Sequence, residues 1–257
     1  MSIMVVISPA KRLAEGGARL GVDATQPVLL DQAEVLVREL RQLDADALAK
    51  LMKLSMPLAV LNVDRFAAWQ RPFDCGNAMQ ALFAFRGDLY RALDVDTLGG
   101  SELAFCQKHL RILSGLYGLL RPLDLMQSYR LEMSTQLTNA QGKNLYAFWR
   151  QRLASVLMQE VAESGATHLI NLASQEYFKA VDVAALAVPV ITPLFKHYSR
   201  GQYRVIGIHA KRARGLMCRW IATQRIGDAE ALKTFTIADY HFDAAQSCGS
   251  EWVFVKE

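Results

Sequence analysis

The chain has 257 residues, of which 52% are hydrophobic and 21% are charged, and its formal net charge at pH 7 is +4. This composition is typical of a soluble globular protein and excludes a disordered or low-complexity chain. No segment approaches the roughly 20 consecutive apolar residues of a transmembrane helix, so we expect no membrane partner. The small excess of Lys and Arg is a weak indication of an anionic partner.

The N-terminal half is predicted to be rich in helices. A β-rich run over residues 3–8 ends at Ser8-Pro9, and a glycine-containing loop follows it. The positive charges of the N-terminal segment lie after its apolar run, which indicates a buried first strand and not a signal peptide. Apolar spacing, the cap residue Asp44 and the first-turn Pro57 then predict helices over 30–43, 44–54, 57–69, 77–93 (interrupted at Gly87) and 101–109.

The C-terminal half changes to β-like runs that alternate with two helices. Strands are predicted over 110–114, 130–133, 167–173, 188–195 and 203–210, helices over 146–163 and 211–225, and a hairpin over 240–257. No linker or repeat divides the chain. We therefore predict one α/β domain over residues 1–257, with a mixed sheet on which the helix-rich segment 30–110 packs.

Basic residues are concentrated near the C-terminal end. No Asp or Glu occurs from Val183 to Gly227. In the helix "AKRARGLMCRWIATQR" the cations fall within an arc of roughly 160°, and the apolar residues fall opposite. Those cations are Lys211, Arg212, Arg214, Arg219 and Arg225. These cations could form a solvated face that pairs with acids from other segments of the chain. The absence of Asp and Glu from residues 183–227 instead favours a surface that binds a polyanion.

The stretch "LSGLYGLLRPLD" (113–124) contains two glycines three residues apart. Gly115 and Gly118 would let the backbone approach a phosphate closely, as the glycine turns of helix-hairpin-helix and KH modules do. Tyr117 and Tyr129 could stack on bases, or could pack in the core. A lone G-x-x-G is a weak signal, so phosphate contact and an ordinary turn both remain open.

Polar residues also follow two predicted strands. "SPAKRL" places Ser8, Lys11 and Arg12 after the first strand, and "INLASQEYFKAV" places Asn171, Ser174 and Glu176 after a later one. Loops at strand ends of α/β sheets often bind ligands, whereas the P-loop pattern is absent. A carboxylate such as Glu132 or Glu176 would be the general acid or base of any reaction. No nucleophile–base pair follows from the spacing, so the catalytic residues are unknown.

The cysteines and histidines lack the spacing of a metal site. Four Cys and five His are dispersed without C-x-x-C, H-x-x-x-H or H-E-x-x-H. We expect reduced thiols in a cytoplasmic protein, no metal and no cofactor.

Five segments in this order give the chain a family resemblance. They are "ISPAKRL", "HLRILSGLYGLLRPLDLMQSYRLEM", "GKNLYAFW", "INLASQEYFK" and "AKRARGLMCRWI". Together they resemble the YaaA family of bacterial peroxide-stress proteins over essentially the whole chain. The resemblance implies a cytoplasmic protein of the response to hydrogen peroxide that limits iron-dependent damage. It also implies an α/β domain with a positively charged cleft, a helix-hairpin-helix-like element, and binding to double-stranded or distorted DNA.

The DNA-contact residues suggested by this resemblance stand inside the matching segments. They are Lys11, Arg12, Arg111, Gly115, Gly118, Arg121, Arg130, Lys211, Arg212, Arg214 and Arg219. A DNA-binding stress protein is the leading hypothesis, and an enzyme acting on a nucleobase or nucleotide is the second. Direct iron sequestration is the weakest, because ligand clusters are missing from the sequence. The oligomeric state is left open, with a monomer as the default.

Overall fold

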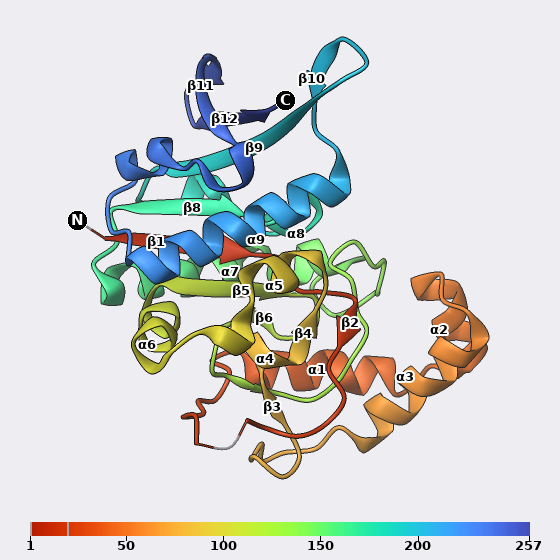
Figure 1. Cartoon of the computed structure of the whole chain (residues 1–257). Helices are drawn as coiled ribbons and strands as arrows, with labels where there is room; N and C mark the ends of the chain where they lie inside the picture. The colour runs from red at the N-terminus through yellow and green to blue at the C-terminus, as the bar shows by residue number, and fades with distance from the viewer. Residues whose placement is uncertain (1, 20) are drawn as a thin grey trace.

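The centre of the fold is a mixed β-sheet. The computed structural model describes residues 2–19 and 21–257, and within them eight strands form one sheet in the order β11-β12-β9-β8-β1-β5-β6, with β10 paired to β9 (Figure 1). The pairs between β12 and β5 along this order are parallel, and the pairs at β11, β10 and β6 are antiparallel. Its strands are β1 (Ile3–Ile7), β5 (Leu110–Ser114), β6 (Gly118–Leu120), β8 (His168–Leu172), β9 (Val190–Ser199), β10 (Gln202–Arg204), β11 (His241–Cys248) and β12 (Glu251–Lys256).

Helices cover the two faces of the sheet. Figure 1 shows α9 in front of the central strands and α7 behind them. The helices are α1 (Leu30–Leu40), α2 (Ala45–Met52), α3 (Met56–Ala68), α4 (Ala81–Ala84), α5 (Asp88–Leu93), α6 (Gly100–His109), α7 (Leu145–Ser164), α8 (Gln175–Phe178) and α9 (Gly207–Gln224). Four short 3₁₀ turns are η1 (Val95–Thr97), η2 (Val183–Ala185), η3 (Glu230–Thr234) and η4 (Ile237–Asp239). One continuous hydrophobic core joins sheet and helices, and every residue of β1 is buried within it.

The predicted α/β class, the mixed sheet and most elements are confirmed. Asp44 caps α2 by accepting a hydrogen bond from the Ala47 amide at 2.8 Å, and Pro57 lies in the first turn of α3. None of the helices in the described part of the chain is long and apolar enough to cross a membrane.

Three element predictions were wrong. Residues 77–93 are not one interrupted helix: α4 lies between the two-residue strands β3 (Met79–Gln80) and β4 (Phe85–Arg86), which pair with β7 (Leu125–Met126) and β2 (Arg12–Leu13). Residues 130–133 form no strand, and α9 begins at Gly207 inside the predicted strand 203–210. At residues 77–93 the pairing with β7 and β2, and not the local spacing, decides the conformation.

Candidate functional site

A cavity of about 350 Å³ lies at the carboxyl ends of β1 and β8. In the sheet, β5 lies on one side of β1, and β8, which comes later in the chain, lies on the other side. The strand order therefore reverses at β1. Open α/β sheets commonly bind ligands at such a point, beyond the carboxyl ends of the strands. Ser8 follows β1 and Ser174 follows β8. The Ser8 hydroxyl oxygen accepts the Ser174 amide at 2.8 Å and lies 3.2 Å from the Ser174 hydroxyl, which fixes the two strand ends together.

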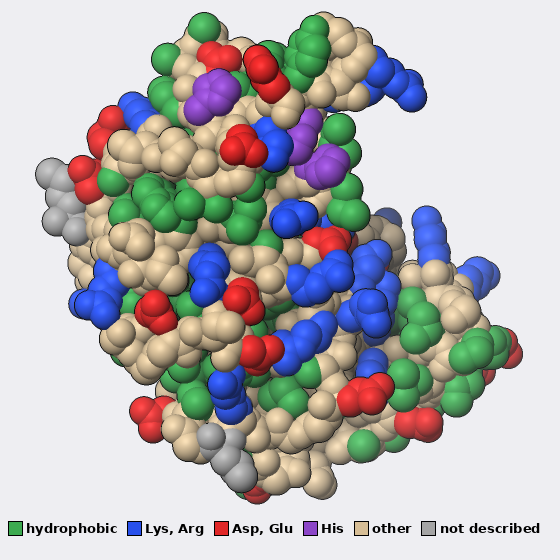
Figure 2. Space-filling view, viewed as in Figure 1, with side chains coloured by type: hydrophobic (Ala, Val, Ile, Leu, Met, Phe, Trp, Pro, Cys, Tyr) green, Lys and Arg blue, Asp and Glu red, His purple; other side chains and the backbone are tan. Residues whose placement is uncertain are grey.

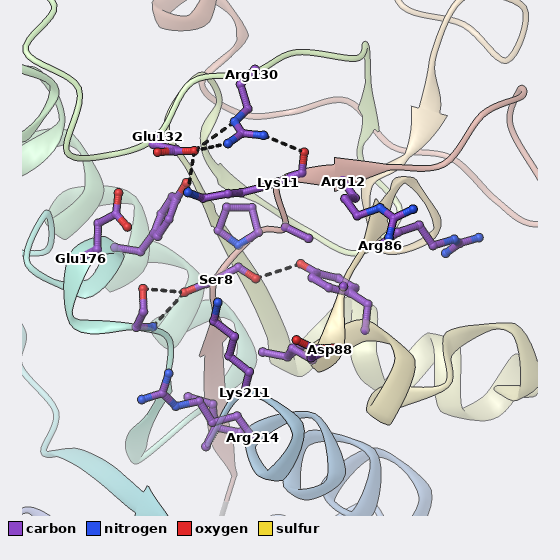
Figure 3. A pocket seen from close by; sticks show the side chains of 18 of the residues that line it. Ser8, Lys11, Arg12, Arg86, Asp88, Arg130, Glu132, Glu176, Lys211 and Arg214 are labelled. Atoms are coloured by element: carbon purple, nitrogen blue, oxygen red, sulfur yellow. Dashed lines mark hydrogen bonds and ion pairs between the residues drawn. The ribbon is translucent and has the colours of Figure 1, made fainter. Parts of the chain in front are cut away.

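Cations outnumber acids in the wall of this cavity. Its charged residues are Lys11, Arg12, Arg86, Asp88, Arg130, Glu132, Glu176, Lys211 and Arg214. They come from the loop after β1, from β2, β4, α5, α8 and α9, and from the segment after β7, so segments far apart in sequence converge at one place (Figure 3). Figure 2 shows Lys and Arg side chains gathering on this face, between α5 and the helices α2 and α3.

Two arginines of this wall lie directly opposite one another. Arg12 of β2 pairs in register with Arg86 of the antiparallel strand β4. Like charges at opposed positions destabilise a strand pair. Arg86 has a carboxylate, that of Asp96, at 3.7 Å, whereas within the described residues no acid lies within 4 Å of Arg12. An anion between the two guanidinium groups would relieve this repulsion.

The predicted acids Glu132 and Glu176 both reach the cavity. Glu132 Oε1 accepts hydrogen bonds from Arg130 Nε and Nη2 at 2.9 and 2.7 Å and forms an ion pair with Lys11 Nζ at 3.1 Å. Glu176 Oε1 accepts from the Ser134 amide at 3.3 Å and from its hydroxyl at 2.7 Å. Each carboxylate is therefore held through one oxygen.

Arg214 lies at the opposite end of the cavity, beside Lys211 one turn earlier in α9. Figure 3 shows both at one end, Arg130 and Glu132 at the other, and Ser8 between them. Arg214 Nε is buried and finds no hydrogen-bond partner in the described chain. Burial lowers the pKa of this guanidinium, and no carboxylate opposes the effect. A buried cation without a partner is costly and is typical of an anion-binding position.

Tyrosines line the space between the two ends. Tyr90, Tyr129 and Tyr177 are buried and contribute to the wall, and the Tyr90 hydroxyl donates to the Ser8 carbonyl at 3.0 Å. Burial raises the pKa of Tyr90 and Tyr177 well above the ordinary value, so both hydroxyls are neutral near pH 7.

The other predicted cations of α9 do not face this cavity. Arg212 and Arg219 line a neighbouring hollow, together with Asp88 and Asp94. Arg212 is exposed, but Arg219 donates to the carbonyls of Leu93 and Asp94 at 2.9 and 3.0 Å and lies 3.5 Å from the Asp94 carboxylate. The prediction that all basic residues of this helix point outward without acids is therefore wrong for Arg219.

Arg111 and Arg121 belong to a buried ion-pair cluster elsewhere in the molecule. The Arg111 side chain is 4% exposed and binds Glu160 Oε2 through Nε at 2.8 Å and also through Nη2. Arg121 binds Glu160 Oε1 through Nε at 2.8 Å and Nη2 at 2.6 Å. These arginines neutralise a buried glutamate of α7. Burial corrects the assignment of Arg111 as a DNA contact, whereas the assignment of Arg121, whose side chain is 28% exposed, stays a prediction.

Gly115 and Gly118 are buried as well. They connect the antiparallel strands β5 and β6, so this segment is not a helix-hairpin-helix. A Cβ on Gly115 would lie 2.2 Å from the Leu131 carbonyl oxygen, and one on Gly118, where φ is +68°, would lie 2.7 Å from the Trp149 ring. Both glycines permit close core packing and not contact with a phosphate, and Tyr117 is fully buried. The helix-hairpin-helix-like element stays a prediction.

Some site residues were missed by sequence reasoning. Arg86 and Tyr90 stand in a segment without a ligand motif, and only the pairing of β2 with β4 indicates Arg86; Tyr177 stands in "INLASQEYFKAV" but was not singled out there. Asn171, considered as a polar strand-end residue, instead turns the chain after β8, where its Oδ1 accepts the Ala173 amide at 3.0 Å. Among the described residues, no three His, Cys, Asp or Glu side chains gather closely enough to hold a metal ion.

Comparison with known proteins identifies the family. The family model described as "Peroxide stress protein YaaA" matches residues 3–246. A "UPF0246 protein" of Neisseria gonorrhoeae (strain NCCP11945) is 49% identical over 251 residues, covering 98% of this chain and 97% of that protein. "UPF0246 protein" sequences of Janthinobacterium sp. (strain Marseille) and Cellvibrio japonicus (strain Ueda107) are each 49% identical over 252 residues, covering 98% of both chains. The chain belongs to the peroxide stress protein YaaA family, which supports a role in peroxide stress.

Proposed function

We propose that this member of the peroxide stress protein YaaA family binds double-stranded or distorted DNA and so protects it during peroxide stress. The binding surface would be the cationic face, which we define as Lys11, Arg12, Arg86, Arg130, Lys211, Arg212 and Arg214. The observation that carries the proposal is the set of cations on this face without a carboxylate within 4 Å in the described residues. They are Arg12, Lys211, Arg212 and Arg214.

Unpaired cations that converge from β2 and α9 repel one another, and a polyanion removes this repulsion. Phosphate contacts release counterions from DNA, so affinity should fall steeply with salt. Each cation that contacts a phosphate contributes about 0.9 to the slope of log affinity against log salt concentration.

The test is fluorescence anisotropy of a labelled duplex, and of the same duplex with a bubble, at several salt concentrations. Arg12→Glu and Arg212→Glu should each weaken binding and reduce the salt slope. Lys108→Glu is the matched control, because Lys108 is an exposed cation in the hollow beside Arg111 and Arg121. Equal losses for Lys108→Glu and Arg212→Glu, or binding insensitive to salt, would reject the cationic face.

Protection from iron-dependent damage is proposed to follow from DNA occupancy. Ferrous iron and hydrogen peroxide nick supercoiled plasmid, and saturating wild-type protein should slow this nicking. The Arg12→Glu/Arg212→Glu double variant should not. If both proteins protect equally, removal of iron or peroxide, and not DNA binding, explains the effect.

A nucleobase-directed enzyme is the second candidate, and the cavity favours it. Ser8, Glu132 and Glu176 line the cavity at the strand ends, where a carboxylate could serve as general acid or base. Oligonucleotides with oxidised or alkylated bases, incubated with the protein and examined by mass spectrometry, test this candidate. Release or conversion of a base that is lost in Glu132→Gln or Glu176→Gln would support it.

A further inference from the structure

The cavity has two chemically different ends. Lys211 and Arg214 form a cationic end, and Glu132 and Glu176 present carboxylates toward the other (Figure 3). A ligand that satisfies both ends carries an anionic group on one side and N–H donors on the other.

The cationic end is suited to a phosphate. Arg214 is half-buried, and its Nε has no partner among residues 2–19 and 21–257. Lys211 lies on the same face of α9, one turn earlier. A guanidinium presents parallel donors that match phosphate oxygens, and an ammonium adds a point charge. The protein itself leaves this position unsatisfied.

The carboxylate end is suited to the edge of a nucleobase. All hydrogen bonds and ion pairs of Glu132 and Glu176 found in the described residues use Oε1, so each Oε2 keeps its accepting capacity. The exocyclic amino group of a base, such as N6 of adenine, carries two N–H donors for such oxygens. Ser134, Lys11 and Arg130 hold both carboxylates in fixed positions before a ligand arrives.

The cavity fits one nucleotide in both its lining and its size. Leu89, Leu131 and Leu172 line it with the neutral tyrosines, which gives a mostly apolar wall for a flat ring. Its volume of about 350 Å³ is at the lower end of the roughly 300–1,000 Å³ of small-molecule pockets. A base pair within a duplex cannot enter such a space, whereas an unpaired nucleotide can.

We infer that this cavity binds a single nucleotide, with its phosphate on Arg214 and Lys211 and its base edge on Glu132 and Glu176. The nucleotide could come from the free pool or be extruded from distorted DNA. The inference rests on the proposed function only for the second source.

Two assays separate these sources. Isothermal titration calorimetry with adenosine 5′-monophosphate, adenosine and inorganic phosphate tests the free nucleotide. Fluorescence of 2-aminopurine in a three-nucleotide bubble tests extrusion, because an unstacked base brightens. We expect the monophosphate to bind at least tenfold more tightly than adenosine, or the 2-aminopurine signal to rise on binding.

Arg214→Met is the main variant, with Lys108→Met as its matched control outside both the cavity and the cationic face. Because Arg214 is half-buried and its buried Nε has no partner in the described residues, its replacement should leave the melting temperature unchanged or raised. It should abolish the tenfold preference for the monophosphate and the 2-aminopurine signal, whereas Lys108→Met should retain both. Glu176→Gln should weaken binding of adenosine and its monophosphate by the same factor.

The outcomes are distinguishable. If duplex and bubble DNA bind but neither the free nucleotide binds nor 2-aminopurine brightens, the inference is rejected and the proposed function stands. If neither DNA binds but the monophosphate does, the proposed function fails and the cavity takes a free nucleotide. Equal binding of adenosine and its monophosphate, or unchanged binding by Arg214→Met, would overturn the assignment of the phosphate end.

Discussion

Replacing Glu160 by Gln tests whether Arg111 and Arg121 serve stability or DNA binding. The Glu160 side chain is 3% exposed and accepts hydrogen bonds from both guanidinium groups, one at each carboxylate oxygen. The neutral amide would leave Arg111 without a counter-charge, although its bonds to the carbonyls of Gln107 and Leu110 at 2.9 and 2.6 Å would remain. Removing one partner of a buried ion pair costs about 3–5 kcal/mol.

That loss is a large fraction of the total stability of a typical protein, about 5–15 kcal/mol. For a chain of this size, 1 kcal/mol shifts the melting temperature by roughly 2–4 °C, so we expect a decrease of about 10 °C. Differential scanning calorimetry and urea titration measure the loss, and anisotropy measures the affinity for DNA.

Glu163→Gln is the matched control. Glu163 is 53% exposed and lies 3.5 Å from the same Arg121, so its loss should cost less than about 1 kcal/mol. Both folded variants should bind duplex DNA like the wild type. If Glu160→Gln were no less stable than Glu163→Gln and changed DNA affinity, Arg111 and Arg121 would have to be surface contacts, and the structural assignment would be wrong.

Two further substitutions test the glycine segment and the buried acid beside it. Gly115→Ala should destabilise the fold by at least about 1–3 kcal/mol in a urea titration, because its Cβ would overlap the Leu131 carbonyl oxygen. Gly100→Ala is the control and should be neutral, because the space around its Cβ is open. Equal losses of stability in the two variants would refute the packing argument. Burial raises the pKa of Asp124 from 3.8 to about 6, so the folded protein holds a proton that the unfolded chain has released, and stability decreases as pH rises through this range. The change is worth about 3 kcal/mol, so Asp124→Asn should gain that much relative to wild type between pH 4 and pH 7, whereas a pH-independent difference would contradict it.

Local sequence patterns were sufficient to predict the sheet, the main helices and the cap at Asp44. Each of these depends on spacing within a few residues, and their partners are backbone groups or the general apolar core. The prediction failed at residues 203–210. Their composition is β-like, but the packing of α9 makes the second half of this segment helical. Gly215 of this helix lies so close to α5 that a Cβ would stand 2.2 Å from the Leu89 carbonyl oxygen. Nothing in the spacing of residues 203–210 reports that contact.

The candidate site was predictable only in part for the same reason. Lys11, Arg12, Arg130 and Arg214 reach the cavity as basic residues of the matching segments, but Arg111 is equally basic and equally inside one. What distinguishes it is Glu160, 49 residues later on α7, whose position depends on the tertiary fold. Charge counted along a chain therefore overestimates the cations that are available to a ligand.

Whether a cation has a carboxylate partner in the folded protein indicates a functional cation better than its place in the sequence does. At Arg111 the buried charge has the Glu160 carboxylate, and the guanidinium also donates to the carbonyls of Gln107, Lys108 and Leu110, so the position is complete without a ligand. At Arg214 burial is present and the carboxylate is missing, and at Arg12 the opposed residue carries the same charge. Both arrangements lower stability, and a fold retains such local conflicts chiefly where they serve a function. Because β2 and α9 bring these conflicts to one cavity, this cavity is where we expect an anionic ligand to bind.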